Sequence, residues 1–74
     1  MTVEDSIKSL TKEIREVRIK RKLTQVQLSE LTGIQQPFIS RMEQGVVMPT
    51  WRMLERLAKV LDIEFDFSVV DTTI

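Results

Sequence analysis

The sequence predicts one small, mainly α-helical domain that ends in a single β-strand. The chain has 74 residues, which leaves room for only one domain near the lower size limit for a buried core. Apolar residues recur at three- and four-residue steps between residues 3 and 61, the spacing of amphipathic helices, and residues 63–69 then alternate strictly, as in a strand. The chain has no cysteine, so helix packing or self-association must supply its stability.

Two helices are predicted over residues 3–22 and 24–32. The first has a regular apolar stripe, and its last turn, residues 20–22, places cations where the helix dipole favours them. Thr24 is a good N-cap for the second helix, and Gly33 can adopt the positive φ that ends a helix sharply. The apolar positions of the first helix are Ile7, Leu10, Ile14 and Val17, and those of the second are Val26, Leu28 and Leu31.

A third helix is predicted over residues 35–44 and a fourth over residues 50–61. Pro37 falls in the first turn of the third helix, where its missing N–H costs little, and Ile39 and Met42 form the inward pair. Thr50 caps the fourth helix. The apolar face of that helix is Trp51, Leu54, Leu57, Ala58 and Leu61, and this stripe predicts Trp51 as a core residue.

The alternating segment predicts a dimer. Its apolar side is Ile63, Phe65, Phe67 and Val69, and its polar side is Glu64, Asp66 and Ser68. A lone strand leaves backbone donors and acceptors unpaired and an apolar face uncovered. Antiparallel pairing with the same strand of a second subunit removes both problems and makes an isologous homodimer. The expected organisation is therefore a helical domain over 1–62, a dimerisation strand over 63–70 and a free tail over 71–74.

The charges are unevenly distributed although they sum to zero. Residues 1–61 carry all 11 lysines and arginines against 7 acidic residues, whereas residues 62–74 carry 4 acidic residues and no basic one. A basic body with an acidic tail can still bind a polyanion. The N-terminus is too acidic and polar for a signal peptide, and no stretch approaches a membrane span of about 18 apolar residues. We expect a cytoplasmic protein that does not enter a membrane.

The spacing of residues 23–45 predicts two short helices that meet at an angle around a shared core. The small residue Ser29 lies four positions before Gly33, where a larger side chain would obstruct close packing of the helices. The core positions are Leu28, Ile34, Ile39 and Met42. Because Ile39 and Met42 face inward, the residues of the third helix that face outward are Gln36, Pro37, Ser40, Arg41 and Gln44. The outer face of the third helix is therefore mostly made of hydrogen-bonding groups.

Several motifs in this region resemble those of one known family. They are Thr24-Gln25, the turn 32–34, the run 39–43, Gly45 and the helix between Pro49 and residue 61. Over residues 10–61 the sequence is similar to the helix-turn-helix of the lambda-type repressor and Cro family, also called the XRE family. The resemblance implies a lambda-repressor-like bundle whose third helix lies in the major groove of double-stranded DNA.

The resemblance also implies which residues contact DNA. Gln36 matches a position that reads adenine, and Arg41 matches one that reads guanine. Pro37 departs from the usual pattern and either contacts a thymine methyl group or reads nothing, and Gln25 matches a glutamine that binds phosphate and braces Gln36. The implied base-reading set is Gln36, Pro37, Ser40 and Arg41, and the implied phosphate-binding set is Arg15, Lys22, Thr24, Gln25, Gln44, Thr50 and Arg52. Arg18 and Glu43 match a structural ion pair between the first and third helices.

These expectations favour a dimeric transcriptional regulator, a repressor that binds a palindromic operator. Two alternatives stay open: an antitoxin that also binds a toxin, and a protein-interaction module with a vestigial helix-turn-helix and an exposed Phe38. No enzymatic activity and no cofactor are expected, because the chain has no histidine, no cysteine and no glycine-rich phosphate loop. Glu64 and Asp66 share a strand face, but alternating charge there usually serves solubility, and no metal site is predicted.

Overall fold

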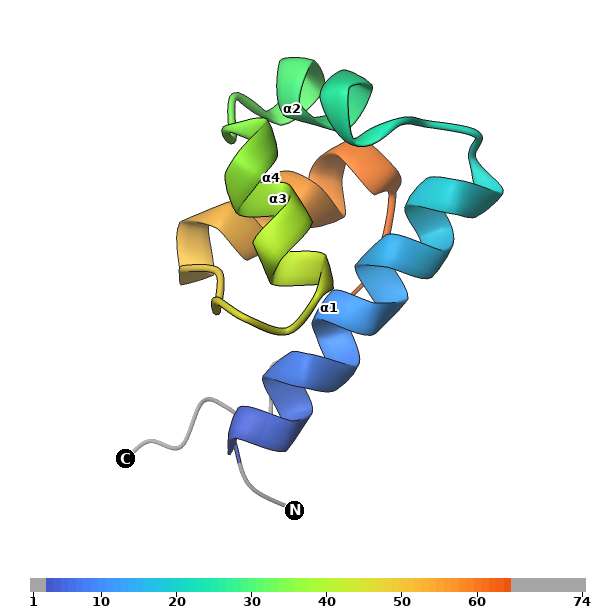
Figure 1. Cartoon of the computed structure of the whole chain (residues 1–74). Helices are drawn as coiled ribbons and strands as arrows, with labels where there is room; N and C mark the ends of the chain where they lie inside the picture. The colour runs from blue at the N-terminus through green and yellow to red at the C-terminus, as the bar shows by residue number, and fades with distance from the viewer. Residues whose placement is uncertain (1–2, 65–74) are drawn as a thin grey trace.

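The computed structural model of the chain describes residues 3–64 and contains four helices in that range (Figure 1). The helices are α1 (Val3–Lys20), α2 (Gln25–Thr32), α3 (Gln36–Glu43) and α4 (Trp51–Leu61). The C-terminal half of α1 packs against α3 and α4, while its first turns extend away from the other helices (Figure 1). The predicted mainly α-helical bundle of four helices is confirmed.

A single apolar core joins all four helices. Its most deeply buried side chains come from α1, α2, α3, α4 and the turn before α3. They are Ile14, Leu28, Ile34, Ile39, Met42, Leu54, Leu57 and Leu61, each no more than 4% exposed. Ile39 and Met42 therefore attach one side of α3 to the core, and the opposite side of that helix lies at the surface.

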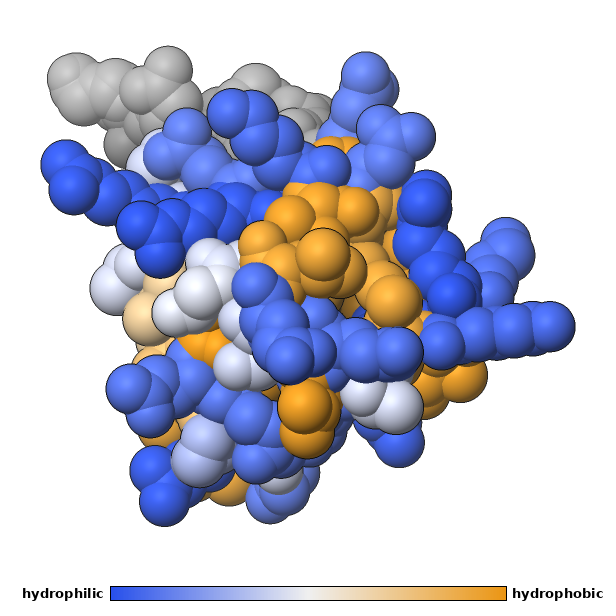
Figure 2. Space-filling model, turned by 90° about the horizontal axis from the view of Figure 1, so that it is seen from above, coloured by the Kyte–Doolittle hydropathy of each residue, from blue (hydrophilic) through white to orange (hydrophobic). Residues whose placement is uncertain are grey.

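Three of the apolar residues expected inside lie at the surface instead. Trp51 is 46% exposed, because it is the first residue of α4 and lies one turn beyond Leu54, past the edge of the core. Val26 and Leu31 of α2 are 56% and 58% exposed. The buried side of α2 runs along Leu28 and Thr32, and the other two residues fall on either side of that line. Seen from above, apolar surface gathers in the middle of this face, with polar side chains around it (Figure 2).

The helix ends show why the chain turns where it does. α1 ends at Lys20, two residues earlier than expected, because Lys22 adopts a positive φ of 60°. Thr24 caps α2 in a capping box: its Oγ1 accepts from the Gln27 amide, and the Gln27 side chain accepts from the Thr24 amide. Gly33, with φ at 77°, ends α2 and turns the chain toward α3.

The cap at Thr24 gives a direct stability prediction. Replacing Thr24 with alanine removes the acceptor for the Gln27 amide, and we expect the free energy of unfolding to fall by about 1 kcal/mol. Urea denaturation measures this change, and Thr24→Ser is the matched control because serine keeps the hydroxyl. Equal stability of the alanine and serine variants would contradict the capping role.

Only the first residues after α4 are described. The backbone amide of Ile63 donates to the Ala58 carbonyl at 2.9 Å and closes the helix end, and its side chain packs partly against the core. The other members of the predicted dimer interface, Phe65, Phe67 and Val69, lie outside the described residues, as do Asp66 and the tail 71–74. None of the helices in residues 3–64 has the length and apolarity needed to cross a lipid bilayer.

Candidate nucleic-acid interface

The outward side of α3 carries the residues that the sequence placed there. Residues 36, 37, 40, 41 and 44 fall on one side of a helix because they are spaced one and four apart. Pro37, Arg41 and Gln44 are exposed, whereas Gln36 and Ser40 are half-buried. The Gln44 amide donates to the Ser40 hydroxyl at 3.1 Å. The structure therefore brings the four predicted base-reading residues together with Gln44 on one polar face.

Hydrogen bonds within the turn hold α2 and α3 at a fixed angle. The Ser29 hydroxyl donates to the Ile34 carbonyl, so a small hydroxyl residue spans the place where the helices approach. Thr32 Oγ1 donates to the Leu28 carbonyl at 2.8 Å and accepts from the Ile34 amide at 3.2 Å. These polar groups of the turn are thus paired, and their hydrogen bonds connect the end of α2 to the turn that leads into α3.

Gln36, at the start of α3, is held by a residue of α2. Its Nε2 donates to Gln25 Oε1 at 2.8 Å, and Gln25 Nε2 donates to Glu43 Oε1 at 3.1 Å. The two glutamines that the resemblance paired are therefore in direct contact. Each keeps a second N–H on its Nε2 beyond the bonds described.

Glu43 also binds two arginines of α1. Arg18 Nε donates to Glu43 Oε2 at 2.7 Å and Arg18 Nη2 donates to Oε1 at 2.9 Å, while Nη1 donates to the Leu23 carbonyl at 2.8 Å. The side chains of Arg18 and Glu43 are only 11% and 2% exposed. Arg15, a predicted phosphate ligand, is 57% exposed, with its Nε 4.0 Å from Glu43 Oε1. The buried pair has the geometry of a structural ion pair.

The remaining predicted phosphate ligands lie at helix starts. Thr24 and Thr50 are the N-caps of α2 and α4, and Thr50 Oγ1 accepts from the Met53 amide at 3.2 Å. Lys22 is exposed two residues before Thr24, and Arg52 is exposed in the first turn of α4. Helix N-termini and cations together favour phosphate groups.

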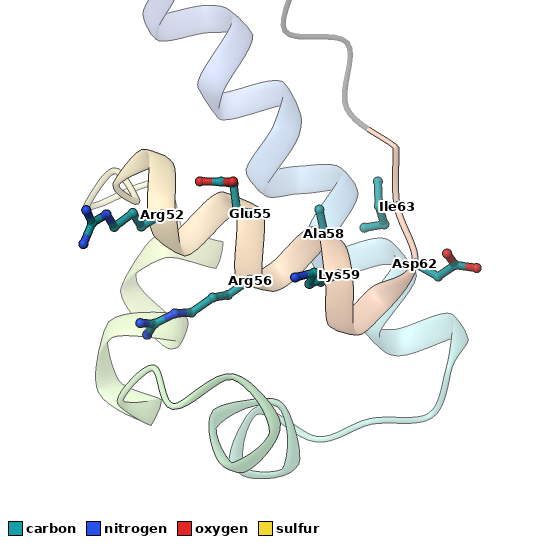
Figure 3. A pocket seen from close by; sticks show the side chains of 7 residues that line it. All are labelled: Arg52, Glu55, Arg56, Ala58, Lys59, Asp62 and Ile63. Atoms are coloured by element: carbon teal, nitrogen blue, oxygen red, sulfur yellow. The ribbon is translucent and has the colours of Figure 1, made fainter.

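The sequence reading missed two cations on α4. Arg56 and Lys59 are exposed and follow Arg52 at four- and three-residue steps, a spacing that could have identified them as one basic row. With Glu55, Ala58, Asp62 and Ile63 they line an open hollow on the outer side of α4 (Figure 3). Arg52 lies at the N-terminal end of this row and Asp62 at the opposite end (Figure 3). Arg56 and Lys59 therefore extend the row of cations that begins at Arg52, a predicted phosphate ligand.

The expectation of an exposed Phe38 is wrong. Phe38 is half-buried and packs against the core, because it lies one turn before Met42 and shares the inner side of α3. In the described part of the chain, no group of three acidic, histidine or cysteine side chains is placed to hold a metal ion.

Comparison with known proteins agrees with this geometry. A family model described as helix-turn-helix matches residues 14–68, which is about three quarters of the chain. Comparisons with curated proteins and with solved structures gave no significant match. The extent of the family match and the paired helices α2 and α3 lead to one conclusion: the chain belongs to the helix-turn-helix family of XRE type, whose members are DNA-binding transcription regulators.

Proposed function

We propose that this regulator is a sequence-specific repressor that binds a palindromic operator as a homodimer, with α3 of each subunit in the major groove. The observation that carries the proposal is the polar face of α3, where a half-buried Gln36 is oriented by Gln25 and Arg41 is exposed.

The two leading side chains match base edges in the major groove. The amide of Gln36 has its Oε1 and one N–H available, and these can pair with N6 and N7 of adenine. The guanidinium of Arg41 can donate two bonds to O6 and N7 of guanine. Ser40 and Pro37 complete the face, and Pro37 either contacts a thymine methyl group or reads nothing.

Phosphate contacts position the protein and supply most of its affinity. The amides at the starts of α2 and α4, capped by Thr24 and Thr50, are suited to hold phosphates on either side of the recognition helix. The side chains that would neutralise or bind further phosphates are the exposed Arg15, Lys22, Gln44 and Arg52 and the half-buried Gln25.

Selection from a random DNA library tests the proposal. We expect enrichment of a palindrome whose half-sites lie about 10 base pairs apart, centre to centre, because a two-fold dimer presents its recognition helices one helical turn apart. The affinity for the enriched duplex should fall steeply between two salt concentrations through counterion release. No enrichment, or binding that does not depend on salt, would overturn the proposal.

Gln36 is expected to determine one base pair in each half-site. Replacing it with alanine should remove about 1 to 3 kcal/mol of discrimination at that base pair and leave the other positions unchanged. The matched control is Gln35→Ala, since Gln35 is the exposed N-cap of α3 and its side chain makes no capping bond. The measurement is competition binding with single-base variants of the selected site, and an unaltered preference would remove Gln36 from the interface.

Self-association is expected to depend on the apolar side of the predicted strand. Phe67→Asp should convert the dimer into monomers, because a charge would be placed in the face that the two strands share. Ser68→Asp adds the same charge on the opposite side and should leave the dimer intact. Sedimentation velocity distinguishes the two, and an unchanged dimer of Phe67→Asp would refute strand pairing.

The partial burial of Phe38 weakens the alternative of a protein-interaction module. An exposed aromatic ring on α3 was one of the grounds for that alternative, and the ring instead packs partly against the core. The antitoxin role stays a prediction of the resemblance, and copurification with a larger partner from the native host would support it.

A further inference from the structure

We propose that Glu43 determines the preference of Gln36 for adenine over guanine, by fixing the direction of a chain of hydrogen bonds that ends at the DNA-facing amide. The chain runs from Gln36 to Gln25 and from Gln25 to Glu43, and the ion pair with Arg18 anchors it. This inference rests on the proposed function, in which Gln36 reads a base. It gives the buried ion pair a role in recognition as well as in folding.

The buried side chain of Glu43 limits which groups can contact it. The Glu43 side chain is 2% exposed, and both of its oxygens accept hydrogen bonds from the Arg18 guanidinium, the pairing of a carboxylate. A carboxylate only accepts hydrogen bonds. Any amide that contacts it must therefore present its NH₂ group and not its oxygen.

Gln25 transmits this requirement from Glu43 to Gln36. Gln25 turns its Nε2 toward Glu43 at 3.1 Å, so its Oε1 faces the other way, toward Gln36. An amide oxygen only accepts, so Gln36 must donate through its own Nε2, which it does at 2.8 Å. The orientation of both amides follows from the charge on one buried residue.

Gln36 keeps one donor and one acceptor for DNA after it binds Gln25. One N–H of its Nε2 is used by Gln25, which leaves the other N–H as a donor and Oε1 as an acceptor. Adenine offers an acceptor at N7 and a donor at N6, which matches this edge. Guanine offers two acceptors, N7 and O6, so the Gln36 oxygen would face another oxygen.

The reverse chain would have the opposite preference. If both amides turned over, Gln36 Oε1 would be occupied and both N–H groups of its Nε2 would be free to face the two acceptors of guanine. That arrangement would place Gln25 Oε1 against the Glu43 carboxylate, where two acceptors meet. Glu43 thus acts as a positioning residue that excludes the guanine-reading orientation.

The direction of the chain is measured first in the free protein. Trans-hydrogen-bond NMR couplings should connect the Gln25 side-chain nitrogen with the Glu43 carboxylate carbon, and the Gln36 side-chain nitrogen with the Gln25 amide carbon. Couplings in the reverse sense, or none, would overturn the inference without any reference to DNA. This measurement uses the unaltered protein and does not depend on whether a variant folds.

The effect on recognition is measured with the double variant Arg18→Met/Glu43→Met. Replacing both members of a buried ion pair by apolar residues of similar size removes the charge without leaving one member unpaired. The duplex is the one selected by the unaltered protein, and the base pair is the one identified by Gln36→Ala. The readout is the ratio of affinities for adenine and guanine at that base pair, compared with the same ratio at the base pair read by Arg41.

We expect the adenine-to-guanine ratio at the Gln36 position to fall by at least about fivefold, the lower end of what one bidentate base contact contributes. The ratio at the Arg41 position should stay the same, and Glu16→Gln, which changes an exposed carboxylate of α1, should alter neither. An unchanged ratio in a folded double variant would overturn the inference and leave DNA binding intact. If the unaltered protein selects no DNA site, the proposed function fails as well, and if it selects a site but Gln36 reads no base, only the inference fails.

Discussion

Replacing Glu43 with alanine is expected to lower the free energy of unfolding by about 3 to 5 kcal/mol. The substitution leaves the Arg18 guanidinium, whose side chain is 11% exposed, without the carboxylate that binds its Nε and Nη2. An unpaired buried charge costs more than the lost attraction, because its desolvation is no longer offset. Since small domains are stable by only about 5 to 15 kcal/mol, this variant should be largely unfolded well below the midpoint temperature of the unaltered protein.

Urea denaturation, followed by circular dichroism, measures this loss. The double variant Arg18→Met/Glu43→Met should recover most of the stability, because neither charge is then left alone. Glu16→Ala, at an exposed position of α1, should change stability by no more than about 0.5 kcal/mol. A Glu43→Ala variant within about 1 kcal/mol of the unaltered protein would mean that water compensates the unpaired Arg18 guanidinium.

The helices were predictable because their signals are local. Periodic apolar residues, the N-caps Thr24 and Thr50, and Gly33 with its positive φ each act within a turn of the positions they determine. The end of α1 was misplaced by two residues, because the positive φ at Lys22 has no sequence signal comparable to a glycine. Local patterns therefore give the number and order of the helices and leave some of their ends uncertain.

The errors in burial have a different origin. Trp51 and Phe38 are both aromatic and both at helix starts, yet the first is 46% exposed and the second packs against the core. Which residue is covered depends on how far the neighbouring helices extend over each end, and periodicity along one helix contains no such information. An apolar stripe predicts the inner side of a helix but not where the core stops.

The candidate site was predictable in its residues but not in its connections. The outward positions on α3 follow from the burial of Ile39 and Met42, and the contact between Gln25 and Gln36 was implied by the resemblance. The bond from Gln25 to Glu43 joins residues 18 positions apart and arises only when α2 and α3 are docked. For this reason the sequence suggested a structural ion pair and a separate reading face, whereas the structure joins them in one network.

Substitutions on the two sides of α3 are expected to have different effects. Those on the buried side should lower stability, and those on the exposed side should change DNA recognition. Ile39 is fully buried, so Ile39→Ala is expected to lower the free energy of unfolding by about 2 to 5 kcal/mol through lost burial and an incompletely filled cavity. Arg41, two residues later, is exposed, and Arg41→Ala should change stability by no more than about 0.5 kcal/mol. It should instead remove about 1 to 3 kcal/mol of discrimination at the base pair that we propose Arg41 reads.

Chemical denaturation and competition binding, performed on the same variants, test this separation. Ile39→Val keeps most of the buried volume and should cost only about 0.5 to 1.5 kcal/mol, with the preferred DNA sequence unchanged. Below its unfolding transition, Ile39→Ala should likewise keep the base preference of the unaltered protein, because Gln36 is held by Gln25 and not by the core beneath it. A changed base preference in Ile39→Ala would show that the core, as well as the hydrogen-bonded network, positions the reading face. Loss of stability in Arg41→Ala would show that its side chain supports the fold, and the guanine contact would then have to be assigned to another residue of α3.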